Sequence, residues 1–216
     1  MDVGAGLVGL LLGLVAGPVA DRIATNSPAH LPLMSGTAPS RRLPFVTAAT
    51  ALLACGAGLE FGLTLEALIV AVFCWILVVI TRTDLEHRLI PNRVILPGAL
   101  LVLVARTIDD PSVGWVAAAL GAGLVLFVIA LVYPRGMGMG DVKLAFFLGA
   151  GLGAAVVVAL FAGFIAAFLP ALLLILRHGG EARKRAIPFG PFLALGGVVA
   201  VFAGDQILDW YLSFGS

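Results

Sequence analysis

The fold class is decided by residues 142–176, VKLAFFLGAGLGAAVVVALFAGFIAAFLPALLLIL, a run of 35 residues whose one charge is Lys143. A continuous helix of this length would extend about 52 Å at ~1.5 Å per residue, whereas the apolar core of a bilayer is roughly 30 Å thick. Gly149, Gly151 and Gly153 offer a tight turn inside the run. The stretch therefore predicts two short membrane-spanning helices joined by that turn.

Six further apolar runs complete the predicted membrane domain, at residues 3–20, 45–59, 63–81, 94–105, 113–133 and 188–208. Hydrophobic residues make up 61% of the chain and charged residues 12%, half of the ~25% that soluble domains carry. This composition excludes a soluble enzyme and a disordered chain. We expect an all-α, polytopic membrane bundle of about eight transmembrane helices, forming one membrane-embedded domain over residues 1–216.

The distribution of positive charge predicts the orientation. If the first helix runs from outside to inside, 12 of the 13 Lys and Arg residues fall on the inner side and Arg106 alone on the outer side, as the positive-inside rule requires. Seven spans would place the basic cluster at 177–185 outside. We therefore expect both termini outside, a cytoplasmic loop at about 21–43 and a location in the cell (inner) membrane, with the lipid bilayer as a partner.

Other cofactors and partners receive no support from the sequence. Cys55 and Cys74 lie inside apolar runs and form no C-x-x-C pair, so we interpret them as small buried hydrophobic residues and expect no metal site and no cofactor. The formal net charge of +1 gives no basic field for nucleic acid. Gly9, Gly13 and Gly17 lie four residues apart, a spacing that allows two helices to approach closely.

Two aspartates carry the functional hypothesis. Asp84 ends the third predicted helix and Asp141 opens the sixth, 57 residues later. Between them the chain goes out on the fourth helix and returns on the fifth, so the topology predicts that both carboxylates lie on the inner face at one depth. Two carboxylates a few Å apart share one proton. The ionised one can then take a proton from water while the protonated one donates to a carbonyl oxygen or a leaving amine, which is aspartic peptide hydrolysis.

The residues around the aspartates fit such a site. Gly136, Gly138 and Gly140 alternate before Asp141, which allows positive φ and leaves room for an extended substrate strand. Pro91 restricts Ile90 to extended geometry, ending any helix that runs through Asp84.

Structural roles remain open for the same residues. Asp141 is well placed to cap a helix, and Asp84 to pair with Arg82 or Arg88. We interpret Glu86 and His87 as interfacial residues and Lys143 as an anchor at the membrane surface.

The sequence resembles the type IV prepilin peptidases, membrane aspartic proteases with a GxGD motif. Gly138-Met139-Gly140-Asp141-Val142-Lys143-Leu144 resembles the motif of the second aspartate, and Asp84 followed by Arg88-Leu89-Ile90-Pro91-Asn92 resembles that of the first. Ile187-Pro188-Phe189-Gly190-Pro191-Phe192 resembles the opening of the family's last helix.

The resemblance implies an endopeptidase that removes the short basic leader from prepilin-like or pseudopilin-type substrates at the cytoplasmic membrane surface. Asp84 and Asp141 would be its catalytic pair. The surrounding active-site loop would comprise Gly136, Gly138, Gly140, Lys143, Pro91 and Asn92.

One departure concerns a second activity. Many members of this family also N-methylate the new N-terminus, and those often carry two C-x-x-C pairs in the first cytoplasmic loop. Residues 21–43 contain no cysteine. This excludes a cysteine zinc site there and argues against methyl transfer.

Three alternatives remain. Presenilin-like intramembrane proteases share the GxGD motif, but Thr83 stands where they have a tyrosine, and Pro170-Ala171-Leu172 lies in the middle of a span. A proton-coupled transporter could use the same carboxylates, although acids near the centre of several spans would favour it more. An inactive assembly factor would show the same pattern.

Overall fold

A computed structural model of the chain describes residues 1–28, 31–34, 40–134, 136–178 and 188–214. These residues form eight α-helices and a short 3-10 helix, η1, and contain no β-strand. The elements are α1 (Val3–Asn26), α2 (Leu43–Phe61), α3 (Leu65–His87), α4 (Asn92–Asp109), α5 (Val113–Val132), α6 (Met139–Leu152), η1 (Gly153–Ala155), α7 (Val156–His178) and α8 (Gly190–Ser213). The all-helical prediction is therefore confirmed.

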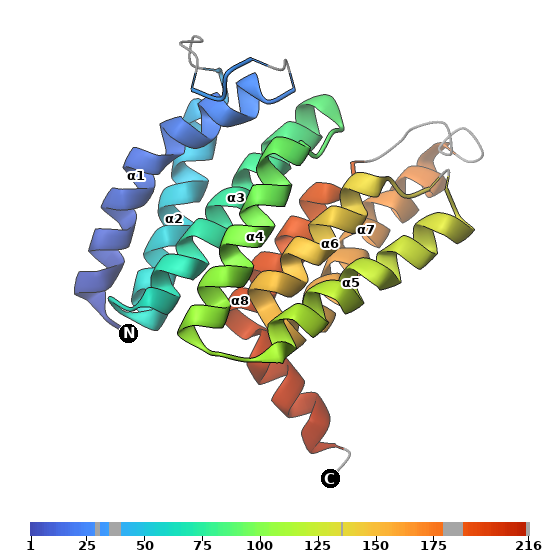
Figure 1. Cartoon of the computed structure of the whole chain (residues 1–216). Coiled ribbons are helices and arrows are strands. Elements are labelled where there is room, and N and C mark those ends of the chain that lie inside the picture. Colours follow the sequence, from blue (N-terminus) through green and yellow to red (C-terminus); the bar gives the residue numbers. More distant parts are fainter. Residues whose placement is uncertain (29–30, 35–39, 135, 179–187, 215–216) are drawn as a thin grey trace.

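The helices run up and down through one bundle, with both chain ends at the same end of it (Figure 1). The α3–α4 and α5–α6 connections lie at the other end. Helix α3 is central and packs against α1, α2, α4 and α8. Its fully buried Phe73 stacks on Phe147 of α6, with the ring centroids 4.8 Å apart. The core thus joins the two helices that carry the predicted aspartates.

The outer face of the bundle is apolar, as a lipid-facing surface must be. Large hydrophobic side chains are exposed on every side of it, including Leu11, Leu52, Leu100, Leu124 and Phe161. Among the described residues, six helical stretches are long and apolar enough to cross a membrane by length and composition. The chain is therefore a multi-pass membrane protein.

The described residues hold two fewer candidate crossings than the eight predicted. One of the six stretches is Met139–Leu174, which contains α6, η1 and the first part of α7, and α4 is not among the six. At ~1.5 Å per residue, the 14 residues of α6 extend about 21 Å. Eight helices are observed, whereas eight crossings remain a prediction.

The predicted turn inside residues 142–176 is confirmed at Gly153. Its φ of +57° lies in the left-handed region, which glycine enters without strain, and the chain reverses there between α6 and α7. Gly149 and Gly151 belong to α6 instead, where a Cβ atom would collide with Ala118 and Phe73. These two glycines serve helix packing and not the turn.

Two predicted helix ends were wrong. Helix α1 continues to Asn26, so Asp21 and Arg22 belong to the helix and not to the loop predicted at 21–43. Helix α3 continues to His87, so Asp84 lies one turn before the helix ends. Both extensions contain charged side chains that look interfacial in the sequence, but the structure buries Asp21 and Asp84.

The close approach expected from Gly9, Gly13 and Gly17 is confirmed, because all three face α2 at backbone distance. A Cβ atom on Gly13 would lie 2.5 Å from the Cα of Ala51, and one on Gly17 would lie 2.5 Å from the Cα of Thr47. Without water to drive apolar surfaces together, such close packing holds membrane helices to each other.

We therefore expect Gly13→Leu to separate α1 from α2 and to lower the unfolding temperature of the detergent-purified protein, because overpacking costs typically ~1–3 kcal/mol. Gly121→Leu is the matched control, since a Cβ atom there meets nothing within 4 Å. Thermal unfolding followed by tryptophan fluorescence measures both. Equal melting of the two variants would contradict the packing argument.

Candidate active site

Asp84 and Asp141 line one cavity of about 220 Å³ at the end of the bundle where α3 ends and α6 begins. The prediction that the topology brings them together is confirmed. The other lining residues come from the α3–α4 connection and from the first turns of α4 and α6: Arg88, Leu89, Ile90, Asn92, Gly138, Gly140 and Lys143. The two carboxylates are near enough to act on each other electrostatically, and Arg88 acts on Asp84 in the same way.

Asp84 is held in place by a residue 106 positions later in the sequence. Its side chain is buried, with 6% of the residue exposed, and its Oδ2 atom accepts a hydrogen bond from the backbone N–H of Gly190 at 3.0 Å. Gly190 is the first residue of α8, where the helix dipole favours a negative charge. A Cβ atom at Gly190 would lie 2.8 Å from the same Oδ2 atom. Glycine is therefore required for this contact.

Gly190 is a residue that the sequence reasoning did not place in the site. A signal for it exists, because it lies within the stretch 187–192 that resembles the opening of the family's last helix. Nothing in the spacing indicates that this glycine reaches Asp84, 106 residues earlier.

The chain leaves α3 at Arg88, which adopts the left-handed conformation at φ 52° and ψ 42° and donates its N–H to the Asp84 carbonyl at 2.9 Å. This turn, and not Pro91, ends the helix. Pro91 instead begins α4, with its carbonyl accepting from Val94 and Ile95. Because the helix ends at this turn, Arg88, Leu89 and Ile90 line the cavity beside Asp84.

Asp141 is the third residue of α6, and Gly138 occupies the N-cap position. The Oδ2 atom of Asp141 accepts from the Gly138 N–H at 3.2 Å, and the Asp141 N–H donates to the Gly138 carbonyl at 3.1 Å. The capping role considered for Asp141 is thus present, although from the third position. It coexists with a place in the cavity.

The glycines before Asp141 do not adopt the positive φ that the sequence allows, whereas the room they leave for an extended substrate strand stays a prediction. Among the described residues, only Gly62 and Gly153 are glycines with positive φ, so Gly136, Gly138 and Gly140 need no special backbone conformation. A Cβ atom on Gly140 would lie 3.2 Å from the Cβ of Ile90. That glycine makes room for the α3–α4 connection.

Gly136 lies outside the aspartate cavity. It lines a neighbouring cavity of about 230 Å³ together with Met137, Phe164 and Phe189. Its inclusion in the active-site loop is not supported by this placement.

Lys143 and Asn92 connect the two motifs across the cavity. The Nζ atom of Lys143 donates to Oδ1 of Asn92, the first residue of α4, at 2.7 Å. Lys143 therefore does more than anchor the chain at a membrane surface, since it ties the start of α6 to the start of α4.

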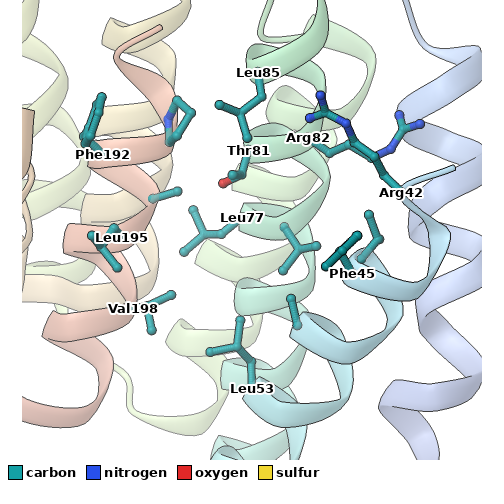
Figure 2. A pocket seen from close by; sticks show the side chains of 15 residues that line it. Arg42, Phe45, Leu53, Leu77, Thr81, Arg82, Leu85, Phe192, Leu195 and Val198 are labelled. Carbon is teal, nitrogen blue, oxygen red and sulfur yellow. The ribbon is translucent and has the colours of Figure 1, made fainter. Parts of the chain in front are cut away.

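A larger apolar groove of about 700 Å³ lies between α2, α3 and α8 (Figure 2). Arg42, Arg82 and Leu85 lie at one end of it, and Leu53 and Val198 further along. No sequence pattern predicts this groove, because it forms between helices that are distant in the chain. In the described part of the chain, no three His, Cys, Asp or Glu side chains are grouped closely enough to hold a metal ion.

The comparisons with known proteins agree with the motifs. Residues 71–176 match the model of the type IV leader peptidase family. A protein of Bacillus subtilis (strain 168) named prepilin leader peptidase/N-methyltransferase is 34% identical over 174 residues, covering 78% of this chain and 69% of that protein.

Proteins of the same name from Legionella pneumophila and Pseudomonas aeruginosa are 33% and 35% identical, each over 81% of this chain. The chain spans 63% and 62% of these two relatives. No solved structure is significantly similar to the chain. On these matches, and with both aspartate motifs in one cavity, the chain belongs to the type IV leader peptidase family.

Proposed function

We propose that the chain is a membrane aspartic endopeptidase that removes the short basic leader from prepilin-like or pseudopilin-type proteins. The observation that carries the proposal is the cavity that Asp84 of α3 and Asp141 of α6 line together. The names of the relatives support the substrate class.

In this mechanism the two carboxylates share one proton. The ionised carboxylate removes a proton from a water molecule, which attacks the scissile carbonyl, while the protonated carboxylate donates its proton to the carbonyl oxygen. When the C–N bond breaks, the proton taken from water passes to the leaving amine, and the gem-diol returns its proton to the dyad. Each aspartate accepts a backbone N–H, from Gly190 or from Gly138. Because the two groups titrate as a pair, the base and acid roles belong to the dyad and not to one residue.

The proposal includes an orientation. The cavity would face the cytoplasm of a cell (inner) membrane, with eight crossings, both termini outside and residues 1–216 as one domain. The charge asymmetry supports it: Arg42 and Arg88 border the end with the aspartates, while Arg106 lies at the opposite end of α4. There the Arg106 Nε donates to the Gly151 carbonyl at 3.0 Å, at the end of α6.

The alternatives gain no support from the site. A transporter would be favoured by carboxylates near the centre of several spans, whereas Asp84 and Asp141 lie in terminal turns of α3 and α6. Pro170-Ala171-Leu172 lies within α7 and does not border the aspartate cavity. Leader peptide hydrolysis therefore accounts for the geometry best.

We expect Asp84→Asn and Asp141→Asn each to reduce leader cleavage about 10²–10⁴-fold or more, because each removes one member of the acid–base pair while keeping its size. The assay is cleavage of a synthetic prepilin-like peptide by the purified protein in detergent, followed by mass spectrometry. Asp109→Asn, at an exposed residue near the other end of the bundle, is the control and should cleave normally. Full activity of either site variant would remove that carboxylate from the mechanism.

The glycines provide a second, graded prediction. Gly190→Ala should lower the cleavage rate most, because the new Cβ would lie 2.8 Å from Asp84 Oδ2. Gly138→Ala should be the mildest although it alters the GxGD motif, because its Cβ would lie 3.6 Å from Asp141 Oδ2 and its φ of −85° suits alanine. Rates measured for both folded variants in the same peptide assay test this order, and the reverse order would refute the geometry.

The relatives' names also include N-methyltransferase, and we propose that this chain acts as a peptidase alone, since residues 21–43 lack cysteine. A prepilin co-expressed with this chain should be cleaved and carry an unmodified N-terminus. Mass spectrometry of the mature pilin tests for methylation, because each methyl group adds to the measured mass. A methylated product that depends on this chain would overturn this part of the proposal.

A further inference from the structure

An ionic network with a buried centre lies on the side of α3 opposite to Asp84. The Nε atom of Arg82 lies 3.0 Å from Oδ1 of Asp21 in α1, and its Nη1 atom lies 3.2 Å from Oε2 of Glu86. The side chains of Arg82 and Asp21 are 4% and 2% exposed. Two positions on a helix differ by roughly 200° of rotation, so Arg82 and Asp84 point to opposite sides of α3.

The network continues into the segment before α2. Asp21 also accepts the Ser40 backbone N–H at 3.1 Å and the Ser40 hydroxyl at 2.6 Å. The Nε atom of Arg42 lies 3.2 Å from Oε1 of Glu86. Arg42 and Arg82 therefore share the carboxylate of Glu86, and the two arginines lie close together in Figure 2. The network joins α1, the start of α2 and the last turns of α3.

This placement constrains Asp84 in particular. Arg82 and Glu86 are one helical turn apart, and Asp84 lies between them on the other side of the helix. A shift or rotation of these turns would separate Arg82 from Asp21 and leave a buried charge uncompensated, which is strongly destabilising. Apolar packing allows α3 to slide or rotate more easily than buried ion pairs to a neighbouring helix do.

We propose that Arg82 and Asp21 are positioning residues: they fix the rotation and depth of the last turns of α3, so that Asp84 meets the Gly190 N–H and faces Asp141 across the cavity. Neither residue borders the cavity, so both act through the helix. The inference rests on the proposed peptidase function.

The first test compares two Arg→Lys variants of the full chain in the peptide assay. Arg82→Lys keeps the positive charge, but a single ammonium group cannot hold two carboxylates as the planar guanidinium does. We expect kcat per folded enzyme to fall about ten- to a hundredfold, as for a small misplacement of a catalytic group, while KM stays unchanged. Arg22→Lys, at the exposed residue next to Asp21, is the matched control and should match the wild type.

A second comparison separates positioning from stability. Asp21→Asn should show the same loss of kcat, and the double variant Asp21→Asn/Arg82→Lys should be no slower than the slower single variant, because both act through one contact. The amount of folded protein is measured by size exclusion and thermal unfolding. The positioning proposal is overturned if Arg82→Lys has the same kcat as Arg22→Lys. It is also overturned if Arg82→Lys changes only the amount of folded protein or only KM.

The parallel wild-type and Asp84→Asn reactions distinguish the two proposals. Cleavage by the wild type but not by Asp84→Asn supports the peptidase proposal. If Arg82→Lys then cleaves at the normal rate, the positioning proposal is refuted and the peptidase proposal stands. No cleavage by the folded wild type would refute both.

Discussion

The structure of the site depends on one hydrogen bond, from the backbone of Gly190 to the carboxylate of Asp84. Asp84 lies in the last turn of α3, where the helix dipole disfavours a negative charge. The N-terminus of α8 supplies the compensating positive end. Because the donor belongs to the backbone of a glycine, α8 can approach closely enough for its first turn to meet the carboxylate directly.

That contact can form only if α3 is fixed with respect to the rest of the bundle. In a membrane the apolar surfaces of the helices are not driven together by water, so small residues and polar contacts between helices specify the arrangement. Here Gly13 and Gly17 bring α1 against α2, and the Asp21–Arg82 pair joins α1 to α3. The aspartate cavity therefore depends on contacts made at the other side of the central helix.

The sequence alone predicts the helices and a turn among Gly149, Gly151 and Gly153, because these follow from long apolar runs and local glycines. It also predicts that Asp84 and Asp141 lie together, because the chain crosses the bundle twice between them. It does not predict the burial of Asp21. A carboxylate after an apolar run is typical of a membrane edge, and its partner Arg82 comes 61 residues later. The hydrogen bond from Gly190 to Asp84 is not predicted for the same reason, since no local sequence pattern indicates which helix N-terminus contacts which carboxylate.

The two carboxylates share a feature that suits acid–base chemistry. Each accepts a backbone N–H at the start of a helix, Asp84 at α8 and Asp141 at α6. Backbone donors stabilise an ionised carboxylate without supplying a mobile proton or a full positive charge. In the proposed dyad, repulsion between two ionised carboxylates keeps one proton shared between them, which is the state that the proposed hydrolysis of an amide requires.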